Sequence, residues 1–193
     1  MAWSMRPSFY TGDVLVLASQ SPRRAEILRQ AGLRFTIRPA IIDETPLAGE
    51  KPQEYVCRLA EEKARAVPLA AGETILGADT TVVVDGQMLG KPEDENDAVR
   101  MLEMLGGRRH EVLTGICLRG NSGCIRDWSS TSVWVAVMSR TEISEYVASG
   151  EPMDKAGAYG IQGLASKFIE RIEGCYFNVV GLPIALVYRY LRR

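Results

Sequence analysis

Residues 74–84 read TILGADTTVVV, an apolar and largely β-branched run that predicts a buried strand. Asp85-Gly86 follows directly, and this dipeptide favours a tight hairpin turn. Two shorter patterns before it, at 13–18 and 35–42, predict further strands. Because helical patterns alternate with these strands, the sequence predicts an α/β fold with a mixed sheet.

The helical segments are marked by their starts and their apolar faces. Ser21 and Pro22 predict a helix start, since serine caps helices and proline suits the first helical position, and Gly32 is expected to end this helix. Apolar residues recur at helical spacing after Pro52. The other expected elements are a helix at 93–105, strands at 111–119 and 124–138, a helix at 141–148 capped by Thr141, a loop at 157–163, a strand at 168–172 and a helix at 183–192.

The composition is that of an ordinary globular protein. Of the 193 residues, 46% are hydrophobic and 24% are charged, so the chain can bury a core. A net charge of −1 argues against nucleic acid or an anionic membrane as a partner. Apolar runs are far shorter than the roughly 18 residues of a spanning helix. We expect a soluble cytoplasmic protein with a tail at 1–12 and a single domain at 13–193.

Scarce residue types restrict the chemistry. With His110 as its one histidine, the chain can hold no multi-histidine metal site. Its four cysteines form no CxxC pair and are expected to be free, mostly buried thiols. Carboxylates, lysines and arginines remain for catalysis, together with a divalent cation bound by oxygen ligands.

Two adjacent arginines stand at the start of the first helix. Arg23 and Arg24 follow Pro22, where the helix dipole disfavours cations. An anion bound between the arginines and the free backbone N–H groups would explain them, with Ser19 adding a hydroxyl. Two solvated arginines would explain the same pattern.

Lys63 and Asp79 are charged residues in apolar surroundings. Lys63 falls on the apolar stripe of its helix, so its ammonium either reaches solvent at the helix edge or meets a buried anion. Asp79 ends the apolar run 75–78 and must be paired, hydrogen-bonded or bound to a metal, unless it caps its own turn. Lys91 follows the next turn and is either one more cation for a ligand or a surface lysine.

Two loops carry further polar candidates. Glu44 follows the second expected strand and offers a carboxylate for a metal. Gln162 lies among glycines that allow a ligand close to the backbone, and its amide both donates and accepts hydrogen bonds, as reading a planar base requires. Together the candidates supply cations for phosphate, carboxylates for a metal and an amide for a base.

A series of motifs in one order resembles the Maf nucleotide pyrophosphatases, formerly described as septum-formation inhibitors. The resemblance covers the chain from about Val14 to its C-terminus. The matching stretches are LASQSPRR (17–24), AGLRF (31–35), DET (43–45), RLAEEKA (58–64), GADTTV (77–82), LGKP (89–92), MLEMLGGRRHEVLTG (101–115), SGEPMDKAGAYGIQG (149–163) and GCYFNVVGLP (174–183).

The resemblance implies an enzyme that hydrolyses nucleoside triphosphates to the monophosphate and pyrophosphate with a divalent cation, Mg²⁺ or Mn²⁺. It implies a long mixed sheet with flanking helices in two lobes around a cleft, similar to inosine triphosphate pyrophosphatases, and a homodimer. Roles in cell-division arrest and in removing non-standard nucleotides belong to the same expectation. The alternatives are a non-catalytic nucleotide-binding regulator of cell division and an enzyme that prefers modified pyrimidine nucleotides.

The resemblance also assigns roles to residues. Asp79 is expected to accept the proton of the attacking water, and Lys63 and Lys91 to hold the phosphates. Family members that act on dTTP and UTP carry an arginine, a threonine and a glutamine at the positions of Arg23, Thr80 and Gln162. We further expect Ser19 and Arg24 to contact phosphate, and Arg23 to contact either phosphate or the base and sugar. Glu44 is expected to bind the cation and Asp79 to share it, and the sequence leaves open whether Asp79 binds the metal directly or acts as the base through water.

Overall fold

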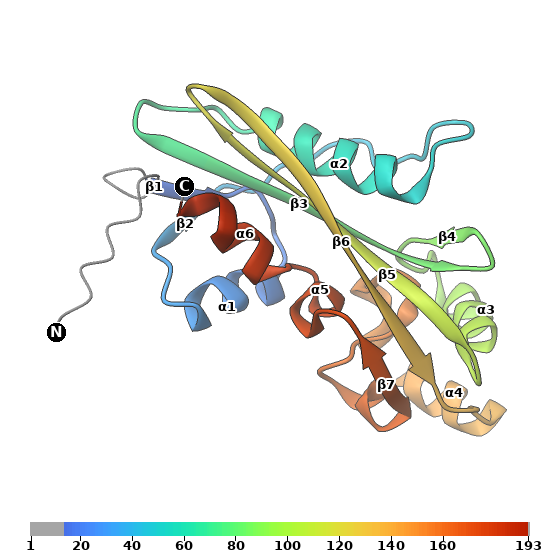
Figure 1. The fold of residues 1–193 in the computed structure, drawn as a ribbon. Helices are drawn as coiled ribbons and strands as arrows, with labels where there is room; N and C mark the ends of the chain where they lie inside the picture. The colour runs from blue at the N-terminus through green and yellow to red at the C-terminus, as the bar shows by residue number, and fades with distance from the viewer. Residues whose placement is uncertain (1–13, 193) are drawn as a thin grey trace, which may run out of the picture. The chain divides into compact units, whose positions relative to one another are not determined.

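The computed structural model describes residues 14–192, so the expected tail at 1–12 lies outside the described part. Seven strands form one sheet in the order β2-β1-β3-β5-β6-β7, with β4 paired to β3 (Figure 1). The strands are β1 (Val14–Leu17), β2 (Phe35–Ile37), β3 (Glu73–Val84), β4 (Gln87–Leu89), β5 (Arg109–Gly120), β6 (Gly123–Val135) and β7 (Ile169–Glu173). The helices are α1 (Pro22–Gln30), α2 (Pro52–Ala66), α3 (Glu95–Leu105), α4 (Arg140–Ala148), α5 (Tyr176–Val180) and α6 (Ile184–Leu191), with 3₁₀ turns η1 (Glu151–Asp154), η2 (Ala156–Ala158) and η3 (Leu164–Phe168).

Both parallel and antiparallel pairs occur in this sheet, which confirms the mixed α/β prediction. β1 pairs in parallel with β2 and with β3. β3 pairs antiparallel with β4, and β6 pairs antiparallel with β7. The β3–β4 turn is the expected Asp85-Gly86 pair, and its φ angles of 49° and 76° are those that this tight hairpin turn requires.

The described residues form two compact units. The first comprises 14–79, 115–129 and 181–192, and the second comprises 80–114 and 130–180. β3, β5 and β6 each contribute residues to both units.

In the first unit, α2 packs against the sheet with backbone touching backbone (Figure 1). A Cβ atom on Gly77 of β3 would lie 2.0 Å from the carbonyl oxygen of Ala60, and one on Gly115 of β5 would lie 2.3 Å from that of Val56. Only glycine permits such an approach at these positions. At these two glycines no side chain lies between α2 and the sheet, so the helix packs directly on the strand backbone.

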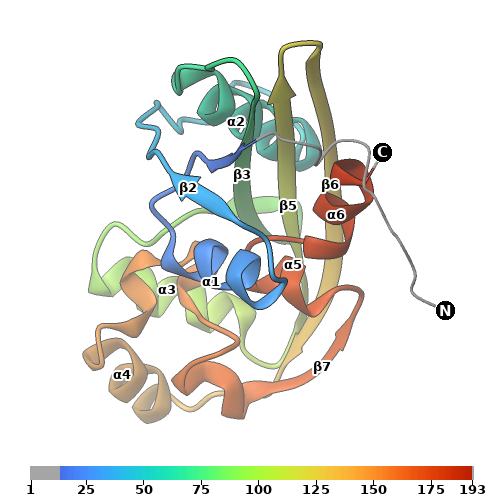
Figure 2. The same ribbon diagram turned by 90° about the vertical axis from the view of Figure 1, so that its left-hand side faces the viewer.

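The C-terminal helix of the first unit is tied to β6, beside which it lies in Figure 2. The Asp127 carboxylate accepts hydrogen bonds from the Tyr190 hydroxyl at 2.6 Å and from Arg189 at 3.2 Å. Asp127 therefore has a structural role.

In the second unit, His110 lies inside the apolar core. It is 2% exposed, its Nε2 atom lies 2.7 Å from the Tyr159 hydroxyl, and its Nδ1 atom has no partner among the described residues. Burial lowers the pKa of His110 to about 4. The ring is therefore a neutral core group that is hydrogen-bonded to the Tyr159 hydroxyl.

This buried ring predicts a loss of stability in mild acid. The unfolded chain binds a proton at His110 near pH 6.5, but the folded chain binds it only near pH 4. The folded state is therefore fully stable with respect to this group above about pH 6.5, and it loses stability as the pH falls towards 4 because protonation favours the unfolded chain. We expect the free energy of unfolding, measured with urea, to fall by about 3 kcal/mol over this range on account of His110. His110→Gln should flatten the dependence, and an unchanged slope in that variant would contradict the assignment.

Several local predictions are corrected by the structure. The strand expected at 35–42 ends at Ile37, because Pro39 has no N–H for the ladder. Ser139 rather than Thr141 caps α4, since the Ser139 and Glu142 side chains bond each other's backbone N–H groups in a capping box. The cysteines are free as expected, but only Cys117 is buried. No helix among residues 14–192 is long and apolar enough to span a membrane.

Candidate functional site

Three charged side chains of the first unit meet at one point. The Lys63 ammonium lies 2.6 Å from an oxygen of Asp79 and 2.6 Å from an oxygen of Glu44. The side chains of Lys63 and Asp79 are 10% and 8% exposed, whereas that of Glu44 is 45% exposed. Lys63 therefore meets a buried anion instead of reaching solvent at the helix edge, and Asp79 is paired instead of capping a turn.

The backbone explains why these residues meet. Gly77 faces Ala60 of α2, and Asp79, two residues on, lies on the same face of β3. Lys63 follows Ala60 by about one helical turn and so reaches the same face. Asp79 is inside β3 rather than at its end, but β1 pairs only as far as Leu76, so Asp79 lies beyond the carboxyl end of its neighbour.

The burial of Asp79 sets its basicity. Burial raises the pKa of the Asp79 carboxyl above its ordinary value, although the positive charges of Lys63 and Arg24 pull it down. A carboxylate whose pKa is raised holds a proton more firmly than an exposed one. Asp79 is therefore suited to accept a proton from a bound water molecule.

The start of α1 supplies a second cation to this unit. The buried Arg24 guanidinium donates to the carbonyl of Gly181 at 2.9 Å and to the hydroxyl of Ser19 at 3.1 Å. The same Ser19 hydroxyl accepts a hydrogen bond from the backbone N–H of Ser21, which caps the helix. Ser19 and Arg24 are thus brought together, and Arg24 is charge-coupled to Asp79 and Glu44. Arg23, next to it, is half-buried.

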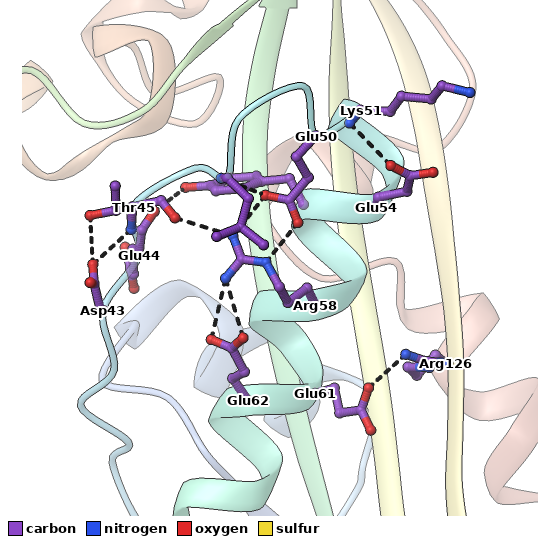
Figure 3. Close-up of polar contacts among 12 residues, drawn as sticks. Asp43, Glu44, Thr45, Glu50, Lys51, Glu54, Arg58, Glu61, Glu62 and Arg126 are labelled. Atoms are coloured by element: carbon purple, nitrogen blue, oxygen red, sulfur yellow. Dashed lines mark hydrogen bonds and ion pairs between the residues drawn. The ribbon is translucent and has the colours of Figure 1, made fainter.

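The loop that carries Glu44 has no regular structure but is held to α2 by Arg58 (Figure 3). The guanidinium binds both carboxylate oxygens of Glu50, at 2.6 and 2.7 Å, and the carbonyl of Thr45 at 3.2 Å. In addition, the Tyr55 hydroxyl donates to the carbonyl of Glu44 at 2.9 Å. The contacts to the backbone carbonyls of Glu44 and Thr45 therefore hold the segment that carries the Glu44 carboxylate.

The carboxylates near Lys63 can be compared with the ligands that a hard divalent cation requires. Among residues 14–192 there is no group of three or more histidine, cysteine, aspartate or glutamate side chains able to hold a metal. Two carboxylates, Glu44 and Asp79, do converge on the Lys63 ammonium. Mg²⁺ is typically bound by one or two carboxylates together with substrate phosphates, so these residues fit such an ion.

The other predicted site residues, Thr80, Lys91 and Gln162, belong to the second unit. Lys91 and Gln162 are exposed, and Thr80 is half-buried. The Thr80 hydroxyl lies 3.0 Å from that of Thr114.

The Gln162 loop is fastened on both sides of the glutamine. Glu151 accepts hydrogen bonds from the backbone N–H of Leu164 at 2.9 Å and from the Tyr146 hydroxyl at 2.9 Å. The same Tyr146 hydroxyl accepts from the N–H of Gly160 at 3.1 Å. The loop whose glycines are expected to allow a ligand close to the backbone is thus anchored at two backbone positions.

The residues that hold these loops and side chains in place were not predicted from the sequence. Arg58, Tyr55 and Glu151 lie within or beside the family motifs, but each contacts loop backbone that is more than ten residues away in the sequence. The one available signal was an arginine and a tyrosine one helical turn apart on α2, a pattern that by itself indicates only a solvated helix face.

The sequence and fold of this chain were compared with those of known proteins. The family model described as Maf-like protein matches residues 14–193. A dTTP/UTP pyrophosphatase of Koribacter versatilis (strain Ellin345) is 54% identical over 183 residues, which cover 94% of this chain and 95% of the relative. One from Anaeromyxobacter dehalogenans (strain 2CP-C) is 53% identical over 183 residues, 93% of each chain. The solved structure of the Staphylococcus aureus Ham1 protein is 16% identical with a TM-score of 0.45, covering 64% of this chain and 72% of that one.

Proposed function

This chain belongs to the Maf-like protein family, and on that premise we propose that it hydrolyses dTTP and UTP to the monophosphate and pyrophosphate. Relatives that are 53% and 54% identical over more than nine-tenths of both chains are named dTTP/UTP pyrophosphatases. The observation that carries the proposal is the buried Lys63–Asp79 pair, joined by Glu44 at the same 2.6 Å distance.

Asp79 acts as the general base in this proposal. Water attacks the α-phosphorus in line with the leaving group, its proton passes to the Asp79 carboxylate, and the bond to the β-phosphate breaks to release pyrophosphate. The raised pKa of Asp79 favours this proton transfer. Lys63, whose ammonium donates to Asp79, holds the carboxylate in place and supplies positive charge for the phosphates.

Glu44 and Asp79 would hold the divalent cation, Mg²⁺ or Mn²⁺. When bound, such an ion neutralises the charge of the triphosphate and stabilises the leaving pyrophosphate. The fixed position of the Glu44 loop supports this assignment, because Arg58 and Tyr55 hold the backbone beside the carboxylate.

The remaining residues bind the substrate. Lys91 and Arg24 contact phosphate oxygens, and the Ser19 hydroxyl supports Arg24 at 3.1 Å. Arg23, Thr80 and Gln162 select the base. The Gln162 amide both donates and accepts, which matches the N–H and C=O groups along the edge of thymine or uracil.

A nucleotide panel tests the proposal. We expect pyrophosphate release from dTTP and UTP in the presence of Mg²⁺ or Mn²⁺ to exceed that from the other nucleoside triphosphates, and EDTA to abolish it. Higher kcat/KM for base-modified pyrimidine triphosphates would redirect the proposal to the removal of non-standard nucleotides. Nucleotide binding without turnover under any of these conditions would overturn it in favour of a non-catalytic regulator.

A further inference from the structure

A chain of hydrogen bonds in the second unit leads away from Thr80. The Thr80 and Thr114 hydroxyl oxygens lie 3.0 Å apart, and the Thr114 hydroxyl donates to the backbone carbonyl of Asn178 at 3.0 Å. Thr114 and Asn178 are both 0% exposed, so water cannot replace either contact.

The direction of each bond follows from counting protons. A threonine hydroxyl has a single hydrogen, and a carbonyl oxygen can only accept. Since the hydrogen of Thr114 is directed to the Asn178 carbonyl, the hydrogen between the two threonines must come from Thr80. Every further partner of the Thr80 hydroxyl oxygen must therefore be a hydrogen-bond donor.

The residue that provides the carbonyl at the end of this chain, Asn178, is itself held firmly. The side-chain amide of Asn178 donates to the carbonyl of Val112 at 2.8 Å and to the Thr131 hydroxyl at 3.0 Å. Thr131 in turn donates to the carbonyl of Cys175 and accepts from the N–H of the same residue. The carbonyl that receives the Thr114 hydrogen thus belongs to a residue fixed at several atoms.

The Asn178 side chain also has one unfavourable feature, which concerns its oxygen atom. The Asn178 side-chain oxygen is buried and has no partner among the described residues. A buried polar atom without a hydrogen bond destabilises the folded state. The amide nitrogen of the same side chain is bonded to Val112 and Thr131, and these bonds fix the residue whose backbone carbonyl receives the Thr114 hydrogen.

We propose that Thr114, oriented by Asn178, fixes the Thr80 hydroxyl as a hydrogen-bond acceptor that recognises the N3–H group of thymine and uracil. The inference rests on the proposed function, in which Thr80 contacts the base. Thymine and uracil carry a hydrogen on N3, whereas the N3 atom of cytosine is an acceptor. Two acceptors facing one another cannot form a hydrogen bond, so a fixed acceptor disfavours cytosine at this position. Thr114 is then a positioning residue for specificity, bonded directly both to the Asn178 carbonyl that orients it and to the Thr80 hydroxyl that it fixes.

The test compares dTTP with dCTP, which share sugar and triphosphate. In Thr114→Val the Thr80 hydroxyl loses its fixed acceptor and can turn to donate to cytosine N3. We expect the ratio of kcat/KM for dTTP to that for dCTP to fall about 10-fold in this variant, as loss of one hydrogen bond implies. Thr114→Ser keeps the hydroxyl and should keep the ratio.

The control is Thr81→Val, another buried threonine, whose hydroxyl donates to the carbonyl of Leu89 and not to Thr80. A merely structural effect would lower turnover of both nucleotides and leave their ratio unchanged. The proposal is overturned if Thr114→Val keeps the wild-type ratio, or if the serine variant loses it. Absence of any turnover in the wild-type enzyme would instead overturn the proposed function.

A second measurement needs no variant and so does not depend on folding of Thr114→Val. The wild-type enzyme should hydrolyse UTP at least about 10-fold more efficiently than N3-methyl-UTP, which lacks the N3–H. Thr80→Val lacks the hydroxyl that accepts from N3–H, so its efficiencies with UTP and N3-methyl-UTP should differ less than those of the wild-type enzyme. Equal efficiency of the wild-type enzyme with both nucleotides would overturn the proposal.

Discussion

Replacing Asp79 by asparagine is expected to lower kcat for dTTP by between about 100-fold and 10,000-fold, the usual contribution of a general base. The asparagine amide has nearly the same shape but cannot accept the proton of the attacking water. The buried Lys63 ammonium still has Glu44 as a partner at 2.6 Å, so the variant should fold. Pyrophosphate release at saturating dTTP measures the effect, and a thermal melt verifies the fold.

A matched control separates this effect from the general loss of a paired aspartate. Asp127 also belongs to the first unit and accepts hydrogen bonds from Arg189 and Tyr190. Asp127→Asn should therefore lower stability without a comparable loss of kcat. Asp79→Asn should still bind dTTP, and full turnover in that variant would eliminate Asp79 as the base.

Gly77→Ala is expected to destabilise the protein by at least about 3 kcal/mol, at or beyond the upper end of ordinary overpacking. The added Cβ would lie 2.0 Å from the Ala60 carbonyl oxygen and 2.9 Å from the Ala64 nitrogen. Both atoms are helix backbone, so no side chain can rotate to relieve the contact. Urea denaturation measures the change, and the fraction of soluble protein replaces it if the variant does not fold.

Gly120 provides the matched control for this substitution. It also lies in a strand of the first unit, but a Cβ there would come no closer than 3.8 Å to the Thr74 hydroxyl oxygen. Gly120→Ala should be neutral or slightly stabilising, because alanine loses less conformational entropy than glycine on folding. Equal stability of the Gly77 and Gly120 variants would refute the backbone contact between α2 and β3.

The sequence predicted the placement of Lys63 and Asp79 within the fold better than the contact between them. The apolar stripe of α2 correctly placed Lys63 on the inner face, and the run before Asp79 correctly indicated burial. That these two residues pair with each other, and with Glu44, depends on how distant segments are brought together. Periodicity contains no such information, so the fate of the Lys63 ammonium stayed open until the structure was known.

The fold was predictable at the level of elements and less so at their ends. The strands and helices that carry long apolar patterns were found, as were the Asp85-Gly86 turn and the start of α1. One error arose where two residues could fill the same role. Ser139 and Thr141 are both good helix caps, and only Ser139 has Glu142 three residues later to complete a capping box.

The hydrogen bonds from Arg58 and Tyr55 to the Glu44 loop have a thermodynamic consequence. A segment without regular structure loses conformational entropy when it is ordered, about 1–2 kcal/mol for the backbone of each residue. Because the bonds to Glu50, Thr45 and the Glu44 carbonyl form within the folded chain, this cost falls on folding and not on each encounter with a nucleotide. The Glu44 carboxylate is therefore preorganised at the expense of folding stability. A ligand that binds this carboxylate does not have to order the loop, and its affinity is higher for that reason.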